Sequence, residues 1–134
     1  MKIDGGCHCG FITYAAVADP EAVGICHCTD CQKFSGSAFR IGVAVPEEDF
    51  ELLSGAPKTY VKTAESGGKR AQVFCPECGT HIYSTSAGDG PKVFRIRVPT
   101  ARQCASLPPK RQGWFCSAQA WLADLDSIPI RERG

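Results

Sequence analysis

Three groups of closely spaced cysteines are the residues of this chain best suited to chemistry. The central group has the pattern Cys-x-Cys-x-x-Cys and consists of Cys26, Cys28 and Cys31. Two pairs flank it, with spacings Cys-x-Cys and Cys-x-x-Cys, and comprise Cys7, Cys9, Cys75 and Cys78. Zinc prefers thiolate ligands, and a structural zinc ion takes four ligands in a tetrahedron. The spacing therefore predicts one structural zinc ion held by the two outer pairs.

The central group supplies three ligands, the number typical of a zinc ion that keeps its fourth position open for water or substrate. A thiol that enters as the fourth ligand loses its proton to solvent and is held as a thiolate. Because three thiolates make zinc a poor Lewis acid, thiol capture is favoured over activation of a carbonyl. The alternative is that His27 or a later residue closes the site, which would leave two inert zinc ions.

The cysteine count favours metal binding over disulfides. There are nine cysteines in 134 residues, and seven of them have ligand spacing. Their number is odd, and residues 1–6 lead directly into the first pair without an export signal, so a cytoplasmic location is expected. The two remaining cysteines, Cys104 and Cys116, are predicted to be buried and inert.

Length and composition predict a single domain over residues 1–134. The chain is 43% hydrophobic and 22% charged, with a formal net charge of +1. No basic face is evident, so nucleic-acid binding is not expected, and no apolar run is long enough for a membrane span. The sequence indicates no oligomeric state.

The secondary structure is expected to be mostly β, because short alternating or β-branched runs are separated by Gly and Pro turns. Strands are predicted at 11–17, 23–25, 39–45, 59–63, 71–74, 81–84, 94–98 and 113–116, with one helical turn at 47–50. Residues 32–37, after the central cysteines, are expected to form a loop. Phe39, Trp114 and Trp121 are expected in the core.

Five motifs in order carry a resemblance to a known family. They are Gly-Gly-Cys-His-Cys-Gly at 5–10, Cys-His-Cys-x-x-Cys-Gln at 26–32, Phe-Ser-Gly-Ser-Ala-Phe at 34–39, Phe-Cys-Pro-x-Cys-Gly at 74–79 and Ser-Ala-x-Ala-Trp at 117–121. Their order and spacing resemble the glutathione-dependent formaldehyde-activating family, also called the centromere-protein-V-like domain. The resemblance covers nearly the whole chain.

The resemblance implies an Mss4-like zinc-binding β fold built from short antiparallel strands, with two zinc ions per chain. Cys7, Cys9, Cys75 and Cys78 would hold the structural ion, and Cys26, Cys28 and Cys31 the catalytic one. The implied activity is the condensation of formaldehyde with glutathione to S-hydroxymethylglutathione, formally a carbon–sulfur lyase in reverse. The implied partners are a small-molecule thiol and an aldehyde. The alternative is a non-enzymatic zinc-binding module that carries glutathione or contacts a protein.

Substrate contacts are sought near the third central cysteine. The loop residues Ser35, Gly36 and Ser37 could hold a carboxylate of glutathione, or they could form an ordinary turn. Arg40, Lys69 and Arg70 are candidate carboxylate partners or solvated surface residues. One segment departs from the family: members often carry Gly-x-Leu-Asp-Asp after the strand that contains Arg95, and this chain has Pro-Thr-Ala-Arg-Gln-Cys at 99–104. If that segment shapes the pocket, the substrate differs from that of the family's type reaction.

Overall fold

A computed structural model describes residues 1–134, which form ten short strands, one α-helix and six 3₁₀ segments. The strands are β1 (Lys2–Gly6), β2 (Thr13–Val17), β3 (Val23–Cys26), β4 (Arg40–Pro46), β5 (Phe50–Ser54), β6 (Lys58–Thr63), β7 (Lys69–Phe74), β8 (His81–Ser86), β9 (Val93–Arg97) and β10 (Arg111–Gly113). The helix is α1 (Thr29–Ser35), and the 3₁₀ segments are η1 (Pro20–Ala22), η2 (Glu47–Asp49), η3 (Val98–Thr100), η4 (Cys104–Ser106), η5 (Phe115–Ser117) and η6 (Ala120–Ser127). None of these helices has the length and apolar character needed to cross a membrane.

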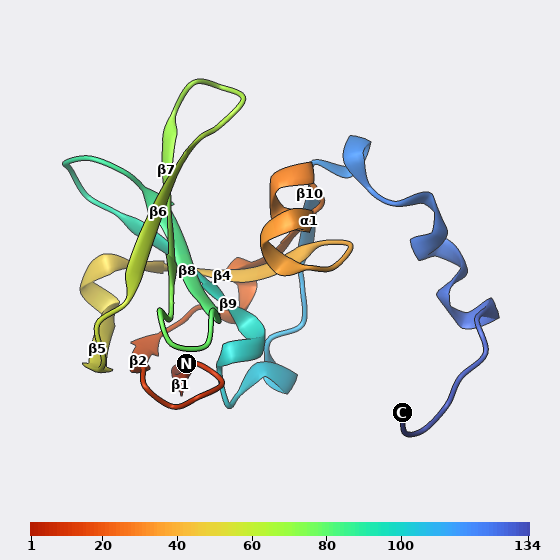
Figure 1. The fold of residues 1–134 in the computed structure, drawn as a ribbon, viewed down its shortest axis with the longest axis horizontal. Helices are drawn as coiled ribbons and strands as arrows, with labels where there is room; N and C mark the ends of the chain where they lie inside the picture. The colour runs from red at the N-terminus through yellow and green to blue at the C-terminus, as the bar shows by residue number, and fades with distance from the viewer.

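The strands form two sheets (Figure 1). The smaller has the order β1-β2-β5, and the larger has the order β10-β3-β4-β9-β8-β7-β6. All pairings are antiparallel except that of β10 with β3, which is parallel. The expected mostly-β fold of short antiparallel strands is therefore confirmed.

The core lies between the two sheets. Along the strands of the larger sheet, apolar side chains that face the smaller sheet alternate with small or polar side chains that face away from it. In β4, Val43 and Val45 are fully buried, and their neighbours in sequence are small or polar. Phe50 of the smaller sheet joins the two layers, since its ring lies 5.2 Å from the ring of Phe94 in β9 and stacks at 5.4 Å on Tyr14. The opposite face of the larger sheet is left free to carry polar side chains.

Two expectations about local structure were wrong. The segment after the central cysteines is helical, because the Cys28 side chain caps α1 by accepting from the N–H of Cys31. Gly36 ends the helix in the left-handed conformation, with φ of 63°, which is the usual role of glycine after a helix. The last predicted strand ends at Gly113, because Trp114 has a φ of 52° and the chain turns into η5.

The expected burial of the tryptophans was also wrong. Trp114 is 53% exposed and Trp121 is 50% exposed. The cause is the direction of the C-terminal segment (blue in Figure 1), which runs away from the sheets and offers these rings no second layer. Phe39 is half-buried.

A substitution at Gly5 tests the close approach of β1 to η3. A Cβ at position 5 would overlap the carbonyl oxygen of Thr100, a backbone atom that cannot move aside easily. We expect Gly5→Ala to lower the free energy of unfolding by about 3 kcal/mol, measured by urea denaturation. The control is Gly68→Ala, where the nearest atom would lie 3.6 Å away. Equal stability of the two variants would contradict the packing described here.

Candidate metal centre and adjoining cavities

The two outer cysteine pairs converge although about 70 residues separate them. The first pair follows β1 and the second follows β7. The Sγ atoms of Cys7, Cys9, Cys75 and Cys78 all lie within 4.8 Å of one another, with Cys7 to Cys9 at 3.6 Å and Cys9 to Cys75 at 3.8 Å. A tetrahedral zinc ion with bonds of about 2.3 Å separates its sulfurs by about 3.8 Å. The donor set therefore fits a closed site for one zinc-sized ion.

Hydrogen bonds to these sulfurs join the two turns. The backbone N–H of Ile12 donates to Cys7 Sγ at 3.2 Å. The Thr80 hydroxyl lies 3.2 Å from Cys78 Sγ, and together with backbone N–H groups it lowers the pKa of Cys78 to about 5. Thr80 also accepts from the N–H of His8 at 3.1 Å. These contacts therefore favour the thiolate forms of Cys7 and Cys78.

The central cysteines also form one cluster. Cys26 ends β3, Cys28 caps α1 and Cys31 lies in its first turn, so the strand and the helix together bring three sulfurs within 4.8 Å of one another. No other Cys, His, Asp or Glu side chain joins this group. The three sulfurs fit a metal site with one free position.

The protonation of the central cluster depends on a proton that Cys26 and Cys31 share through a hydrogen bond. The hydrogen bond with Cys31 lowers the pKa of Cys26 to about 7, against the opposing effect of burial. The same bond, with burial, raises the pKa of Cys31 well above the usual range. Without a cation, the cluster therefore keeps a proton at neutral pH, and a bound metal ion must displace it.

His27 lies beside the central cysteines in sequence but points elsewhere. Its side chain is 1% exposed, and Nε2 lies 2.7 Å from Oε1 of Gln112. The ring makes edge contacts with Phe39 and Phe115 at 5.6 and 5.4 Å. This side chain therefore has a packing role, and the structure does not bring it into the group of sulfurs.

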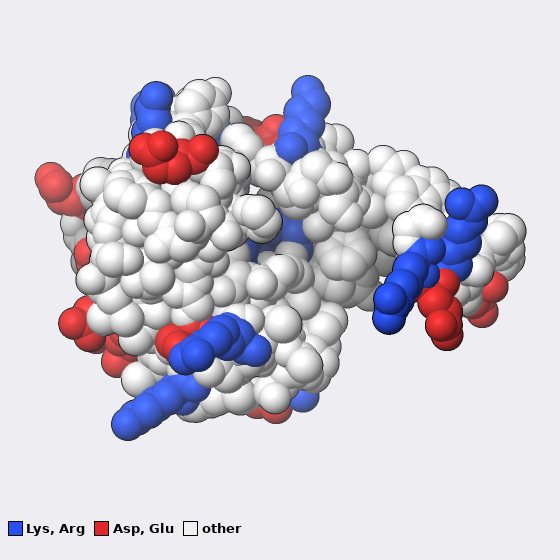
Figure 2. Space-filling model, turned by 60° about the horizontal axis from the view of Figure 1, so that its bottom comes forward, with Lys and Arg blue, Asp and Glu red and all other residues white.

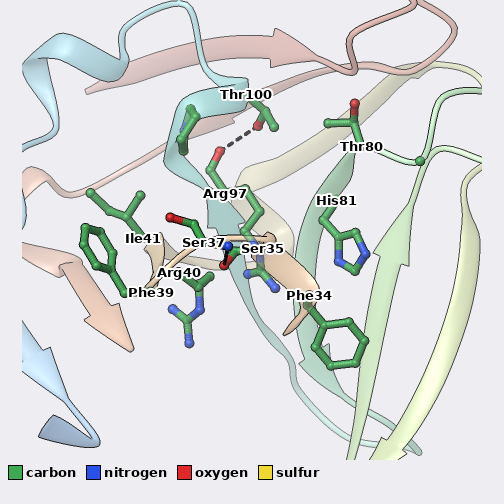
Figure 3. Close-up of a pocket in the computed structure, with 12 residues that line it drawn as sticks. Phe34, Ser35, Ser37, Phe39, Arg40, Ile41, Thr80, His81, Arg97 and Thr100 are labelled. Carbon is green, nitrogen blue, oxygen red and sulfur yellow. Dashed lines mark hydrogen bonds between the residues drawn. The ribbon is translucent and has the colours of Figure 1, made fainter. Parts of the chain in front are cut away.

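A cavity of about 470 Å³ is lined by residues that follow both cysteine clusters in the sequence (Figure 3). Its wall consists of Phe34, Ser35, Ser37, Phe39, Arg40, Ile41, Gly79, Thr80, His81, Arg97, Pro99 and Thr100. Two of the three loop residues expected at a ligand site therefore line it, while Gly36 does not. No carboxylate and no cysteine is part of the wall. Pro99 and Thr100 belong to the segment that departs from the family pattern.

Arg97 is a cavity residue that sequence reasoning missed. It is 8% exposed, and it donates to Gln72 Oε1 at 3.2 Å and to the Arg95 carbonyl at 3.0 Å. Burial, and then the charge of Arg40, lower its pKa to about 10. In Figure 2, basic surface is visible at the floor of a hollow surrounded by uncharged surface. Arg97 stands out as a candidate ligand contact because its guanidinium group is buried without a carboxylate partner. Only the fold reveals this burial.

Other expected residues lie away from the cavity. Lys69 and Arg70 do not line it, and Lys69 is exposed with its Nζ donating to Thr63. The expectation that Cys104 and Cys116 are buried was wrong, because both are exposed. Each lies in a short 3₁₀ segment outside the sheets, where no second layer covers it.

The fold and site define a small mostly-β protein with one four-sulfur and one three-sulfur cluster. The family model described as glutathione-dependent formaldehyde-activating enzyme matches residues 2–117, and the chain belongs to this family. Similar curated proteins from Aspergillus flavus and Aspergillus oryzae, each named putative glutathione-dependent formaldehyde-activating enzyme, are 30% identical over 66 residues. These matches cover 49% of this chain and 34% of those proteins.

A solved structure supports the fold alone. A Rhodobacter sphaeroides protein superposes with a TM-score of 0.61 at 16% identity. The match covers 81% of this chain and 98% of that one.

The shared proton of the central cluster predicts a pH-dependent metal affinity. Because Cys31 stays protonated in the metal-free cluster, metal binding releases at least one proton, and a second near and below the pKa of Cys26. Affinity for zinc, used as the probe ion, should rise at least tenfold per pH unit from about pH 7 to about pH 8, and more steeply below about pH 7. Competition with a chelator measures this slope, with Cys28→Ser as the control. A pH-independent affinity would show that the three sulfurs do not bind as thiolates.

Proposed function

We propose that this protein is a zinc-dependent, carbon–sulfur lyase-type enzyme that joins glutathione to formaldehyde, acting in the cytoplasm. The observation that carries the proposal is the three-sulfur cluster, which leaves one metal position free. The chain belongs to this family, and it has a cavity whose wall contains arginines and no carboxylate. The cytoplasmic location is supported by the two cysteine clusters, since a reducing compartment keeps such closely spaced thiols from forming disulfides.

Zinc is the ion we infer for both clusters, two per chain. Sites built from thiolates alone favour zinc over the harder cations that prefer oxygen ligands. We infer that Cys7, Cys9, Cys75 and Cys78 hold the structural ion and that Cys26, Cys28 and Cys31 hold the catalytic one. When bound at the central cluster, zinc supplies a position at which a thiol is held as a thiolate at neutral pH.

The reaction requires addition without oxidation or reduction. The sulfur of the thiol forms a bond to the carbonyl carbon, the C=O π bond breaks, and the thiol proton ends on the carbonyl oxygen. The task of the protein is therefore to hold sulfur and carbonyl together and to exclude competing water. Phe34 and Phe39 supply apolar surface at the cavity for that purpose.

The 470 Å³ cavity, called the larger cavity below, is the place we infer for the peptide part of glutathione. Arg40 and Arg97 offer guanidinium groups to its carboxylates, and carboxylate recognition by arginine is strong because both charge and fork geometry match. The hydroxyls of Ser35, Ser37 and Thr100 offer acceptors to its ammonium and amide groups. Arg40 connects this cavity to the sulfurs, since it lies directly opposite Cys26 in the pairing of β3 with β4.

Two serine substitutions separate the roles of the clusters. Cys28→Ser should reduce the zinc content from two ions per chain to one and leave the melting temperature nearly unchanged, because α1 keeps a capping oxygen. Cys78→Ser should destabilise the whole domain, because it opens the site that ties the turn after β1 to the turn after β7. Metal analysis and thermal unfolding measure both effects. The proposed division of roles fails if the two variants melt alike.

Glutathione binding and turnover test the activity. Calorimetry on the zinc-loaded protein should show binding with proton release for glutathione, and loss of that proton release for S-methylglutathione, whose sulfur cannot ionise. The rate of S-hydroxymethylglutathione formation should then exceed the uncatalysed rate and fall to it in Cys28→Ser. Thiol binding without rate enhancement would favour the alternative role, a non-enzymatic carrier of glutathione. Binding of neither compound would contradict both.

A further inference from the structure

The outer face of the larger sheet carries an unusual set of charges. Because side chains alternate along each strand, the face opposite the core receives Arg40 and Gly42 from β4, and it receives Arg95 and Arg97 from β9. Register extends this set to the neighbouring strands, adding Arg70 of β7 and Arg111 of β10. No Asp or Glu lies in the strands that contribute these residues. We call these five arginines the arginine face.

None of the five forms an ion pair; the three ion pairs of the protein join other basic residues to Asp30, Asp4 and Glu21. Arg40 and Arg95 are half-buried, and their guanidinium groups donate no hydrogen bond to the protein. The Nε of Arg40 is buried without any partner. Guanidinium groups held close together, partly out of water and unpaired, are costly unless an anion joins them.

A second cavity opens on this face. It has a volume of about 290 Å³, and Cys26, Arg40, Arg95, Arg111 and Trp114 contribute to its wall, which contains no acidic residue. It is distinct from the larger cavity, and only Arg40 lines both.

Two glycines keep the floor of this cavity low. Gly24 and Gly42 face each other across β3 and β4, and both line the cavity. A Cβ at Gly24 would lie 3.4 Å from the side chain of Arg111, and one at Gly42 would lie 3.1 Å from a guanidinium nitrogen of Arg40. The Arg40 side chain therefore lies over bare backbone at Gly42, where a Cβ would crowd it, and the Arg111 side chain lies within contact distance above Gly24.

The backbone at Trp114 supplies an independent observation. It is the one non-glycine residue with a positive φ, and its large ring is half-exposed at the cavity. A non-glycine residue in the left-handed conformation costs free energy, and such residues gather at ligand sites. This backbone conformation places the Trp114 ring in the cavity wall beside the arginines instead of in the core.

We propose that Arg40, Arg95 and Arg111 form a binding site for a compact dianionic oxyanion of the phosphate type, beside Cys26 and walled by Trp114. Three guanidinium groups with no carboxylate match two negative charges and several acceptor oxygens. The same wall disfavours the γ-glutamyl end of glutathione, whose ammonium group would find only positive charge. The inference does not rest on glutathione being the thiol.

The test is calorimetric titration of the zinc-loaded protein with inorganic phosphate and, separately, with methyl phosphate. Arg95→Gln and Arg111→Gln should each weaken binding by roughly tenfold or more, the usual effect of removing a charge-assisted contact. Arg131→Gln, which removes an equal charge from the exposed C-terminal tail, should leave the affinity unchanged. In a Trp121→Phe background, Trp114 is the sole tryptophan, and its fluorescence should change on saturation.

The two titrations distinguish free phosphate from a phosphate group on an organic molecule. Binding of both ligands supports the site and shows that free phosphate suffices. Binding of methyl phosphate alone supports it for a phosphate carried on an organic molecule. Absence of binding at millimolar concentration would overturn the proposal. So would unchanged affinity in both arginine variants, because phosphate would then be held by the metal or another surface. Glutathione binding with proton release, measured on the same variants, reports separately on the proposed activity.

Discussion

The two-residue alternation of β4 and β9 is the constraint on which both core and site depend. One set of side chains, including Val43, Val45 and Ile96, fills the space between the sheets and is fully buried. The alternate set necessarily lies on the other face, where Arg40 stands opposite Cys26 and Arg97 stands opposite Gly42. A shift of one residue in either pairing would place arginines in the core, so the hydrophobic set fixes the register and the register fixes the site.

The arginine face and the thiolate cluster are electrostatically complementary. Adjacent like charges on one sheet face repel, and the pKa of Arg95 is lowered by burial and then by the charges of Arg40, Arg70 and Arg111. The sulfurs of Cys31 and Cys26 act in the opposite direction on Arg97. Three thiolates around the divalent ion that we propose would carry a net charge of −1, which would offset only part of this positive charge. The remainder is available to an anionic ligand.

The sequence predicted features that depend on local spacing and missed those that depend on register. The cysteine spacing singled out two groups of sulfurs that the fold does bring together. Within the central group and within each outer pair, closely spaced thiols are already neighbours, whereas the two outer pairs meet only because β1 and β7 end close together. Alternation identified β4 and β9 within about a residue. Helix α1 was missed because its signal is a cysteine acting as N-cap, where Ser, Thr, Asp or Asn is usual. Arg97 and the second cavity required knowledge of which strands pair, and the half-exposed Trp114 required knowledge of how the chain leaves β10.

Arg40 gives the two cavities a common element, because its side chain lines both and lies beside the sulfurs. An anion bound in one cavity would pair with Arg40, and that guanidinium group would then be less available to an anion in the other cavity. Two anions bound at once therefore compete for the same guanidinium group, and each weakens the other by an equal factor. A ligand that bridges both cavities escapes this penalty, since one molecule then satisfies Arg40 once. With both proposed anion sites in use, the shared arginine would make the site distinguish ligands by their length and charge spacing, and not by their charge alone.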